Sequence, residues 1–357
     1  MMHLGLSISP FGHHPQAWRG KDADAFNVAQ LAAQVSIAQD AGFDFVLFAD
    51  CLGQRPSDNL SPLATPFEPT TLVAALATLA RKIGFVATAA TAQHEPYNLA
   101  RRFASLDTIS GGRCGWNLVA SDRSDGWDDE YASVVTGLWD SWDDDAFVYD
   151  KAEGRFFIAD RMHVLNHIGS HFSVRGPLNV NRSPQGRPLV THVLTPGTWD
   201  LAARFADVIV IAPPLPETAT RVVTDLRRRI ADAGRDGAQV KILATVIPWV
   251  DGQADFQRLQ HLSSTGTAQP DDGRVVVGSP IDIADALQHW FTTTGIDGFV
   301  VEPPVAPEGT EAFIHHLVPE LRRRQLFGDG YAGTTLRDHL GLARPALPVA
   351  TAKERAS

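Results

Sequence analysis

The chain alternates short apolar runs with segments of helical periodicity, and this alternation restricts its possible folds more than any other feature. One unit shows the order clearly. Leu99, Phe103 and Leu106 are spaced four and three residues apart and therefore share one face of a helix. Gly111 follows, and glycine tolerates the left-handed conformation that often ends a helix. Apolar residues then alternate along 114–119, which is the period of a β-strand.

The same order of strand and helix recurs along the chain. The predicted strands are 4–9, 43–49, 83–88, 114–119, 188–194, 207–212, 240–250 and 298–301. Eight β/α units predict an α/β fold, a closed (β/α)8 TIM-like barrel with its site at the carboxyl ends of the strands. A doubly wound open sheet is the alternative, but no glycine-rich dinucleotide motif follows the first strand.

Two regions depart from the regular barrel. Residues 146–187 form an excursion between the fourth helix and the fifth strand, too short to bury a core of its own. Residues 251–274 are a polar loop after the seventh strand. We therefore expect one domain over 1–342 that includes the excursion. Residues 343–357, rich in proline and alanine, are predicted to be a tail that is ordered only when a partner subunit holds it.

Charge and cysteine content exclude several classes of protein. The net charge is −10 and basic residues form no long run, so we expect no binding to nucleic acid or to an anionic membrane. Cys51 and Cys114 are too few for a disulfide framework or a zinc site. The first ten residues do not resemble a signal peptide, and no run is long enough to span a membrane. These features predict a cytoplasmic protein.

Polar residues just beyond the predicted strands are the candidates for a functional site, because the carboxyl ends of barrel strands meet at one mouth. The candidates are His13 and His14 after the first strand, Asp50 after the second, Thr91 after the third, Asn117 and Ser121 at the fourth, Thr195, Pro196, Gly197 and Thr198 after the fifth, and Glu302 after the eighth. Each type also has an ordinary structural explanation. A loop histidine can bond to backbone, Asp50 can cap the next segment, and Thr195 or Thr198 can be a helix N-cap rather than a phosphate contact.

The chain carries no recognisable nucleophile–base pair, phosphate loop or metal-binding motif. His163, His167 and His171 recur every four residues, but the residues around them indicate turn and strand rather than helix, so we expect no metal site. A barrel with a polar mouth and no reactive side chain of its own is typical of an enzyme that relies on an organic cofactor.

Several longer motifs occur in one order along most of the chain. They are HPQAWR at 14–19, FAD at 48–50, EPYNLAR at 95–101, the whole of 102–121, LWDSW at 138–142, HIGSHF at 167–172, RGPL at 175–178 and YAGTTLR at 331–337. In these motifs the chain resembles the flavin-dependent monooxygenases of the nitrilotriacetate and dibenzothiophene-sulfone type, within the bacterial luciferase-like superfamily.

This resemblance implies a TIM-like barrel that binds reduced FMN supplied by a separate flavin reductase and uses O2 to oxidise a small organic or xenobiotic compound. It implies that Asp50, Thr91, Asn117 and Ser121 contact the flavin and that Thr195–Thr198 face its phosphate, with His14 as the candidate catalytic residue. Relatives of this type also suggest a homodimer or homotetramer.

The chain differs from the family pattern in three places. The stretch 121–137 is short and lacks counterparts of a histidine and a tyrosine that contact flavin in the family. Thr195 and Thr198 stand where the phosphate loop has serine and glycine, and the insertion after the seventh strand is reduced to 251–274. Two alternatives therefore stay open: an oxidoreductase that uses the deazaflavin F420, and a barrel that binds a ligand or partner without catalysis.

Overall fold

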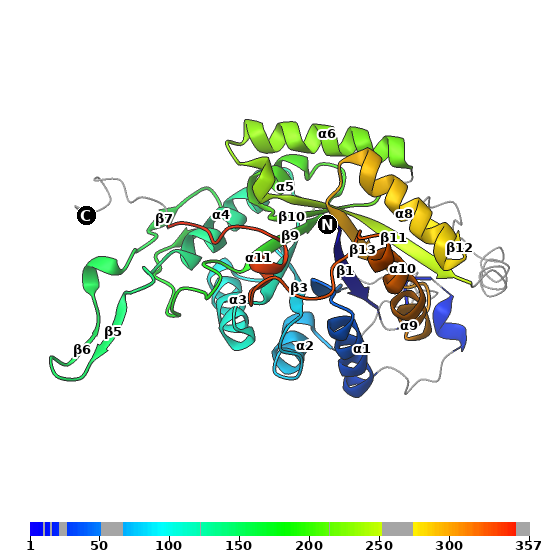
Figure 1. Cartoon of the computed structure of the whole chain (residues 1–357). Coiled ribbons are helices and arrows are strands. Elements are labelled where there is room, and N and C mark those ends of the chain that lie inside the picture. Colours follow the sequence, from blue (N-terminus) through cyan, green and yellow to red (C-terminus); the bar gives the residue numbers. More distant parts are fainter. Residues whose placement is uncertain are drawn as a thin grey trace.

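Parallel strands close into a barrel in the computed structural model, which describes residues 1–9, 11–14, 16–20, 27–50, 67–121, 123–213, 215–251 and 274–347 (Figure 1). The eight barrel strands are β1 (His3–Ile8), β2 (Phe45–Phe48), β3 (Gly84–Ala90), β4 (Cys114–Val119), β9 (Leu189–Val193), β10 (Val208–Ile211), β11 (Lys241–Val250) and β13 (Gly298–Val301). They pair in this order, and β13 pairs with β1 to close the ring. The (β/α)8 prediction is confirmed, and the open sheet is excluded.

Helices cover the outside of the barrel (Figure 1). They are α1 (Val28–Asp40), α2 (Pro69–Leu76), α3 (Pro96–Ser110), α4 (Trp127–Trp139), α5 (Trp199–Phe205), α6 (Pro216–Asp232), α8 (Pro280–Thr294), α9 (Glu308–Ala312) and α10 (Val318–Arg323). Short 3-10 turns lie at Ala17–Gly20 and Gly237–Gln239, and β12 (Val275–Gly278) pairs with the far end of β11. No helix in the described ranges is both long enough and apolar enough to cross a membrane.

Local sequence signals set several helix ends. Gly111 ends α3 in the left-handed conformation, with φ of 72°. Ser279 and Asp282 form a capping box, in which each side chain accepts a hydrogen bond from the other residue's backbone N–H at the start of α8. Residues 313–317 between α9 and α10 form a π-helical turn two residues before Pro319, which has no N–H to donate.

Apolar side chains fill the amino-terminal end of the barrel interior. They come from alternate positions of the strands, which all face inward. This interior cluster consists of Phe45, Leu47, Val86, Leu189, Val208, Val210, Leu243 and Val300, together with Leu336, Leu340 and Leu342. The last three belong to the short helix α11 (Leu336–His339) and the residues after it, so the carboxyl-terminal segment closes this end of the barrel.

The interior becomes polar one inward-facing step further along the strands. Val86, Leu189 and Leu243 are each followed two residues later by a threonine, and these threonines are buried. Because side chains alternate between the two faces of a strand, each threonine also faces inward. The resulting polar layer consists of Ser7, Thr88, Asn117, Thr191 and Thr245. The sequence of this layer places a hydrogen-bonding surface at the carboxyl-terminal end of a hydrophobic barrel.

The excursion at 146–187 has two parts. One is a hairpin of β5 (Phe147–Asp150) and β6 (Arg155–Phe157), which extends away from the barrel at the lower left of Figure 1. After the 3-10 turn Ala159–Arg161, a second hairpin of β7 (His167–Ile168) and β8 (Ser173–Val174) packs Phe172 on the rings of Trp127 and Tyr131 in α4. The second hairpin therefore packs on the barrel helices, whereas the first extends away from them.

The start of the predicted tail is held within the chain itself. Ala343 N donates to Gln239 Oε1 at 2.7 Å, and Arg344 pairs with Asp144, which lies just before the excursion. Pro345 O accepts a hydrogen bond from Arg182 at 2.6 Å. Residues 343–347 therefore make hydrogen bonds and an ion pair within their own chain. Residues 348–357, and 252–273 of the loop after β11, lie outside the described residues.

Candidate functional site

Three neighbouring strands carry one row of polar side chains across the barrel interior. Thr88, Asn117 and Thr191 are Cα partners in the registers of β3–β4 and β4–β9. Asn117 Nδ2 donates to Thr88 Oγ1 at 2.9 Å. Asn117 Oδ1 and Thr191 Oγ1 are buried without a hydrogen-bond partner among the described residues. Buried polar atoms are nearly always paired, so two adjacent exceptions mark a place suited to a polar ligand.

Thr91 and Ser121 meet at one carboxylate beyond β3 and β4. The Thr91 hydroxyl donates to Asp128 Oδ1, and Ser121 donates its N–H to Oδ1 and its hydroxyl to Oδ2, each at 2.9 Å. Asp128 lies in the first turn of α4 and is buried. The carboxylate thus joins two predicted site residues, but it also occupies both of their hydroxyl groups. Beside it, the Arg123 guanidinium stacks 4.3 Å from the Trp127 ring.

The segment after β9 is organised by a buried histidine. His192 Nδ1 lies 2.8 Å from Leu118 O, which can only accept, so Nδ1 carries the proton. Its Nε2 lies 2.8 Å from Thr198 Oγ1. Burial lowers the pKa of His192, against an opposing effect of its backbone hydrogen bond. Neutral His192 can therefore accept from the Thr198 hydroxyl, which draws the start of α5 against the barrel.

Thr198 is the N-cap residue of α5, but its side chain does not cap the helix. Its hydroxyl accepts from Thr195 N at 3.1 Å instead. Thr195, Pro196 and Gly197 are exposed, and a Cβ added to Gly197 would meet nothing within 4 Å. The predicted phosphate loop is therefore an open turn at the rim.

The two histidines after β1 have different environments. Gly12, with φ of 108°, lets the loop approach Pro304 so closely that a Cβ would lie 2.5 Å from Pro304 O. His13 Nδ1 then lies 3.1 Å from Pro303 O, and its Nε2 lies 2.9 Å from Ser7 Oγ. Burial is the main cause that lowers the pKa of His13. Both ring nitrogens of His13 are thus engaged, which is the structural role weighed for a loop histidine.

His14 points one ring nitrogen into its own loop. His14 Nδ1 accepts from Gln16 N at 3.1 Å, so in the neutral form Nε2 carries the proton. Nε2 makes no hydrogen bond to the residues that the structure describes. The ring lies edge-on to Trp249 at 6.0 Å, and burial lowers the pKa of His14. Of the two histidines, His14 is the one with a nitrogen available to a ligand.

An ion pair lies beyond β13 and β11. Arg274 Nη1 is 3.2 Å from Glu302 Oε2 and 3.4 Å from Thr245 Oγ1 in the polar layer. Glu302 is also the first charge that raises the pKa of His13 against the effect of burial. The predicted candidate Glu302 is therefore near His13 on this side of the mouth.

Asp50 is exposed, in contrast to the buried Thr91 and Asn117. Its charge affects the pKa of His94. Burial, the largest cause, and the Arg102 charge lower this pKa, whereas the charges of Glu68 and Asp50 oppose that change. The residues that follow Asp50, 51–66, lie outside the described part of the chain.

Sequence reasoning missed Asp128, His192 and the inward-facing threonines. Asp128 sits in the acidic run WDDE at the start of α4, which reads as an ordinary helix start. Thr88 and Thr191 could have been found by continuing the inward alternation of Val86 and Leu189 along the strands.

His163, His167 and His171 have three different partners, Asp143, Glu130 and Asp125 O. Within the described ranges no group of His, Cys, Asp or Glu could hold a metal ion.

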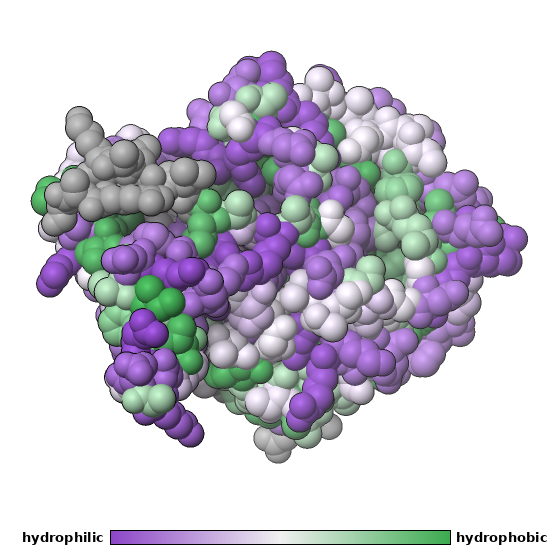
Figure 2. Space-filling model, turned by 60° about the vertical axis from the view of Figure 1, so that its left-hand side comes forward, coloured by the Kyte–Doolittle hydropathy of each residue, from purple (hydrophilic) through white to green (hydrophobic). Residues whose placement is uncertain are grey.

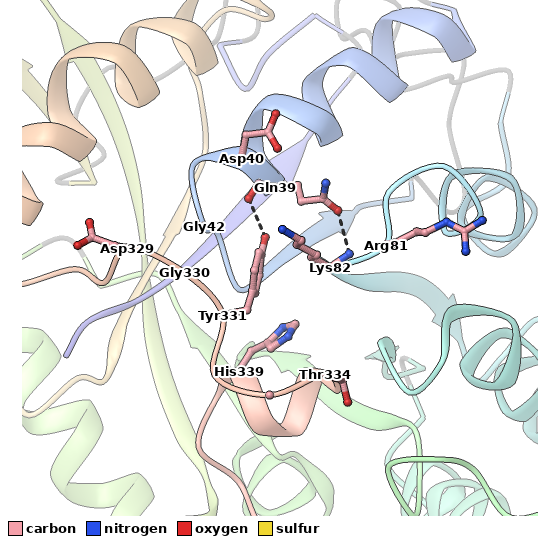
Figure 3. A pocket seen from close by; sticks show the side chains of 11 residues that line it. Gln39, Asp40, Gly42, Arg81, Lys82, Asp329, Gly330, Tyr331, Thr334 and His339 are labelled. Atoms are coloured by element: carbon pink, nitrogen blue, oxygen red, sulfur yellow. Dashed lines mark hydrogen bonds between the residues drawn. The ribbon is translucent and has the colours of Figure 1, made fainter.

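A cavity of about 480 Å³ lies at the amino-terminal end of the barrel, opposite the polar mouth (Figure 3). Its wall includes Tyr331, whose hydroxyl donates toward Phe43 O at 2.9 Å and Gln39 O at 3.1 Å, and His339 of α11. Arg81 and Asp40 place charges of both signs around it. The motif at 331–337 therefore builds the closed end of the barrel, and the candidate site is the polar mouth at the other end.

Residues 7–269 match the family described as luciferase-like monooxygenase. The chain belongs to this family. It is 34% identical to the N-acetyl-S-(2-succino)cysteine monooxygenase of Bacillus subtilis, covering 96% of this chain and 97% of the relative. It is 32% identical to nitrilotriacetate monooxygenase component A of Aminobacter aminovorans, covering 98% of each chain. The structure of the EDTA monooxygenase from Chelativorans sp. BNC1 has a TM-score of 0.83 at 27% identity, covering 96% of this chain and 98% of that one.

The family resemblance predicted from the motifs is thus confirmed, and the chain is a flavin-dependent monooxygenase of this family. The alignments to the two sequence relatives run over 431 and 445 positions, although this chain has 357 residues. These relatives therefore carry internal segments that this chain lacks.

Proposed function

We propose that this chain is the oxygenase component of a two-component system, which takes reduced FMN from a separate flavin reductase and uses O2 to oxidise a small organic compound. The observation that carries the proposal is an adjacent pair of buried oxygens, Asn117 Oδ1 and Thr191 Oγ1, at the carboxyl end of a barrel of this family. Neither oxygen has a hydrogen-bond partner in the described part of the chain. A flavin ring and its ribityl chain present both donors and acceptors, which an amide oxygen and a hydroxyl can match.

The residues at the mouth fit such a cofactor. Asn117 and Thr191 would bind its polar edge from inside the barrel, and the Thr195–Gly197 turn leaves open space and exposed backbone for a phosphate. Thr91 and Ser121 would act through Asp128, which already holds both hydroxyl groups. Asp50 would accept a hydrogen bond at the rim. When bound, reduced flavin supplies the electrons that activate O2.

His14 is the proposed proton carrier at this mouth. Its lowered pKa keeps the ring neutral near pH 7, with the proton on Nε2 because Gln16 N donates to Nδ1. The Trp249 ring lies edge-on beside it at 6.0 Å. The other named features, His192 and the His13–Ser7 pair, hold the loops and keep the mouth in shape.

The proposed substrate is a small organic compound. Two relatives act on N-acetyl-S-(2-succino)cysteine and on nitrilotriacetate, as their names state. We infer a small organic compound of that kind for this chain, and we propose that the chain assembles with copies of itself as a homodimer or homotetramer.

A reconstituted assay tests this function. The chain is combined with a flavin reductase, NADH, FMN and O2, and products are sought from N-acetyl-S-(2-succino)cysteine, nitrilotriacetate and dibenzothiophene sulfone. Flavin binding is measured separately by quenching of FMN fluorescence, with F420 titrated in parallel. We expect FMN binding and oxidation of at least one compound. Preference for F420, or the absence of binding by either flavin, overturns the proposal.

Site variants sharpen that test. Asp50→Ala and Thr195→Ala are expected to weaken FMN binding, whereas Thr224→Ala on the exposed face of α6 serves as a matched control with no effect. If neither mouth variant changes FMN affinity, the proposed placement of the flavin is wrong.

A further inference from the structure

The β5–β6 hairpin exposes a cluster of aromatic side chains. Tyr149 is 54% exposed and Phe156 is 59% exposed, and Val148 is exposed beside them. The hairpin projects from the barrel in Figure 1. Figure 2, turned so that this side comes forward, shows hydrophobic residues gathered at the lower left. Large aromatic side chains grouped on a projecting element are unusual on a monomer and are typical of an interaction surface.

The cluster is anchored to the core by a continuous chain of ring contacts. Trp142 is buried and donates from Nε1 to Leu178 O at 2.6 Å. Its ring contacts Phe147 at 4.6 Å, and Phe147 contacts Phe156 at 5.8 Å. Phe156 in turn contacts Tyr149 at 4.9 Å. These contacts fix the exposed rings in place, so little side-chain freedom would be lost when a partner covers them.

The backbone also directs Tyr149. The pairing of β5 with β6 shifts register between Phe147 and Asp150, and Tyr149 in this bulge has φ of 49°. This left-handed conformation is unfavourable for an aromatic residue. Bulges redirect side chains at sheet edges. Here the bulge holds the Tyr149 ring against Phe156 at the outer end of the hairpin.

The charges of the hairpin favour a second copy of this chain as the partner. The segment 147–157 contains Asp150, Glu153, Lys151 and Arg155 and is neutral, although the whole chain has a net charge of −10. Two copies of such an acidic chain repel each other except where the contact is locally neutral or complementary. Arg155 already pairs with Asp150 of the same hairpin at 3.6 Å, which leaves Lys151 and Glu153. Across a two-fold axis, Lys151 of one copy can face Glu153 of the other, so these two side chains can pair reciprocally.

We propose that the β5–β6 hairpin is the site of self-association, in which the hairpin of one copy packs on the same hairpin of a second copy. This inference rests on the homo-oligomer stated in the proposed function and names the surface that forms it. The aromatic cluster supplies the centre of the contact, and the neutral pairs of charges form its rim. The interface is separate from the polar mouth of the barrel.

Analytical ultracentrifugation of the full chain tests the proposal. The wild type is expected to be a dimer or tetramer at micromolar concentration. The double variant Tyr149→Ser/Phe156→Ser is expected to raise the dissociation constant by about 100-fold or more, because buried aromatic residues dominate interface energies. Ile281→Ser is the matched control: Ile281 is also 59% exposed but lies at the start of α8, and its substitution should leave the assembly unchanged.

A charge exchange provides a second, independent variant. Lys151→Glu/Arg155→Glu and Asp150→Lys/Glu153→Lys are each expected to weaken self-association, and a mixture of the two is expected to form mixed dimers. A monomeric wild type, or an assembly that survives the aromatic double variant, overturns the proposal. FMN titration of the same samples distinguishes this failure from a failure of the flavin proposal, since the hairpin variants should bind FMN as the wild type does.

Discussion

Asn117 on β4 and Thr191 on β9 lie side by side in the barrel, and each has a buried oxygen that no described residue satisfies. In a protein without a ligand, each such atom lowers stability. Removing one should therefore stabilise the ligand-free protein while it weakens ligand binding. Few structural features would produce these two effects together, and the combination gives a direct test of the candidate site.

We predict that Thr191→Val, which keeps the shape of the side chain, raises the free energy of unfolding by about 1 kcal/mol. The same variant should weaken FMN binding by about tenfold, or about 1.4 kcal/mol. Urea unfolding and FMN fluorescence titration measure the two effects. Thr224→Val on α6 is the control. A variant that loses stability without any change in FMN affinity would show that the hydroxyl is structural.

The adjacent histidines should respond differently to substitution. His14→Asn keeps an acceptor for Gln16 N but removes the Nε2 proton, so we predict a fall in turnover of about 10²–10⁴ with little change in FMN affinity. His13→Asn loses its bonds to Pro303 and Ser7 and should lower stability by about 1–3 kcal/mol. Reconstituted turnover and urea unfolding separate the two effects. Equal turnover losses in both variants would contradict the distinction.

Asp107 predicts a specific dependence of stability on pH. Its buried carboxylate accepts hydrogen bonds from Gln185 and Cys114 N, at 2.6 and 2.9 Å, and from Ser183. Burial raises the pKa of Asp107 to about 6, although these bonds oppose that change. Because the folded pKa exceeds the unfolded value, the stabilising contribution is complete below about pH 4 and is lost as the pH rises through about 6.

Asp107→Asn should remove this dependence, since the amide oxygen can accept from Cys114 N and Gln185 while its NH2 group donates to the Ser183 hydroxyl. The stability of the wild type relative to the variant is expected to fall between pH 4 and 6.5 by on the order of 3 kcal/mol. Urea unfolding of both proteins across this range measures the difference. Parallel stability curves would mean that the carboxyl group titrates at its ordinary pKa.

The closed end of the barrel should be important for stability and not for FMN binding at the polar mouth. Leu340→Ala removes a fully buried side chain from the interior cluster and is predicted to lower stability by about 2–5 kcal/mol. FMN affinity of the folded protein should stay unchanged, because α11 lies at the opposite end from the polar mouth. Leu79→Ala, at a side chain that is 66% exposed, is the control and should change stability by less than about 0.5 kcal/mol. Weaker FMN binding by folded Leu340→Ala would show that the two ends are coupled.

The fold was predictable from the sequence because its signals are local. Strand and helix periods, the glycine that ends α3 and the apolar runs each act over a few residues. Candidate positions at the mouth followed from the strand ends alone. The excursion was harder to predict, because the position of its β5–β6 hairpin depends on ring contacts that begin at Trp142.

By itself the sequence determined the barrel, its family and the polar residues at the ends of its strands. Only the tertiary structure decided which of them act together. Asp128 accepts hydrogen bonds from both Thr91 and Ser121, and His192 is hydrogen-bonded to Thr198. Both ring nitrogens of His13 are within hydrogen-bond distance of partners, Pro303 O and Ser7. His192 reaches Leu118 O across 74 positions of the chain, and Asp128 reaches Thr91 across 37. Such partners are chosen by how the strands close into a ring, and no local pattern of residues encodes that choice.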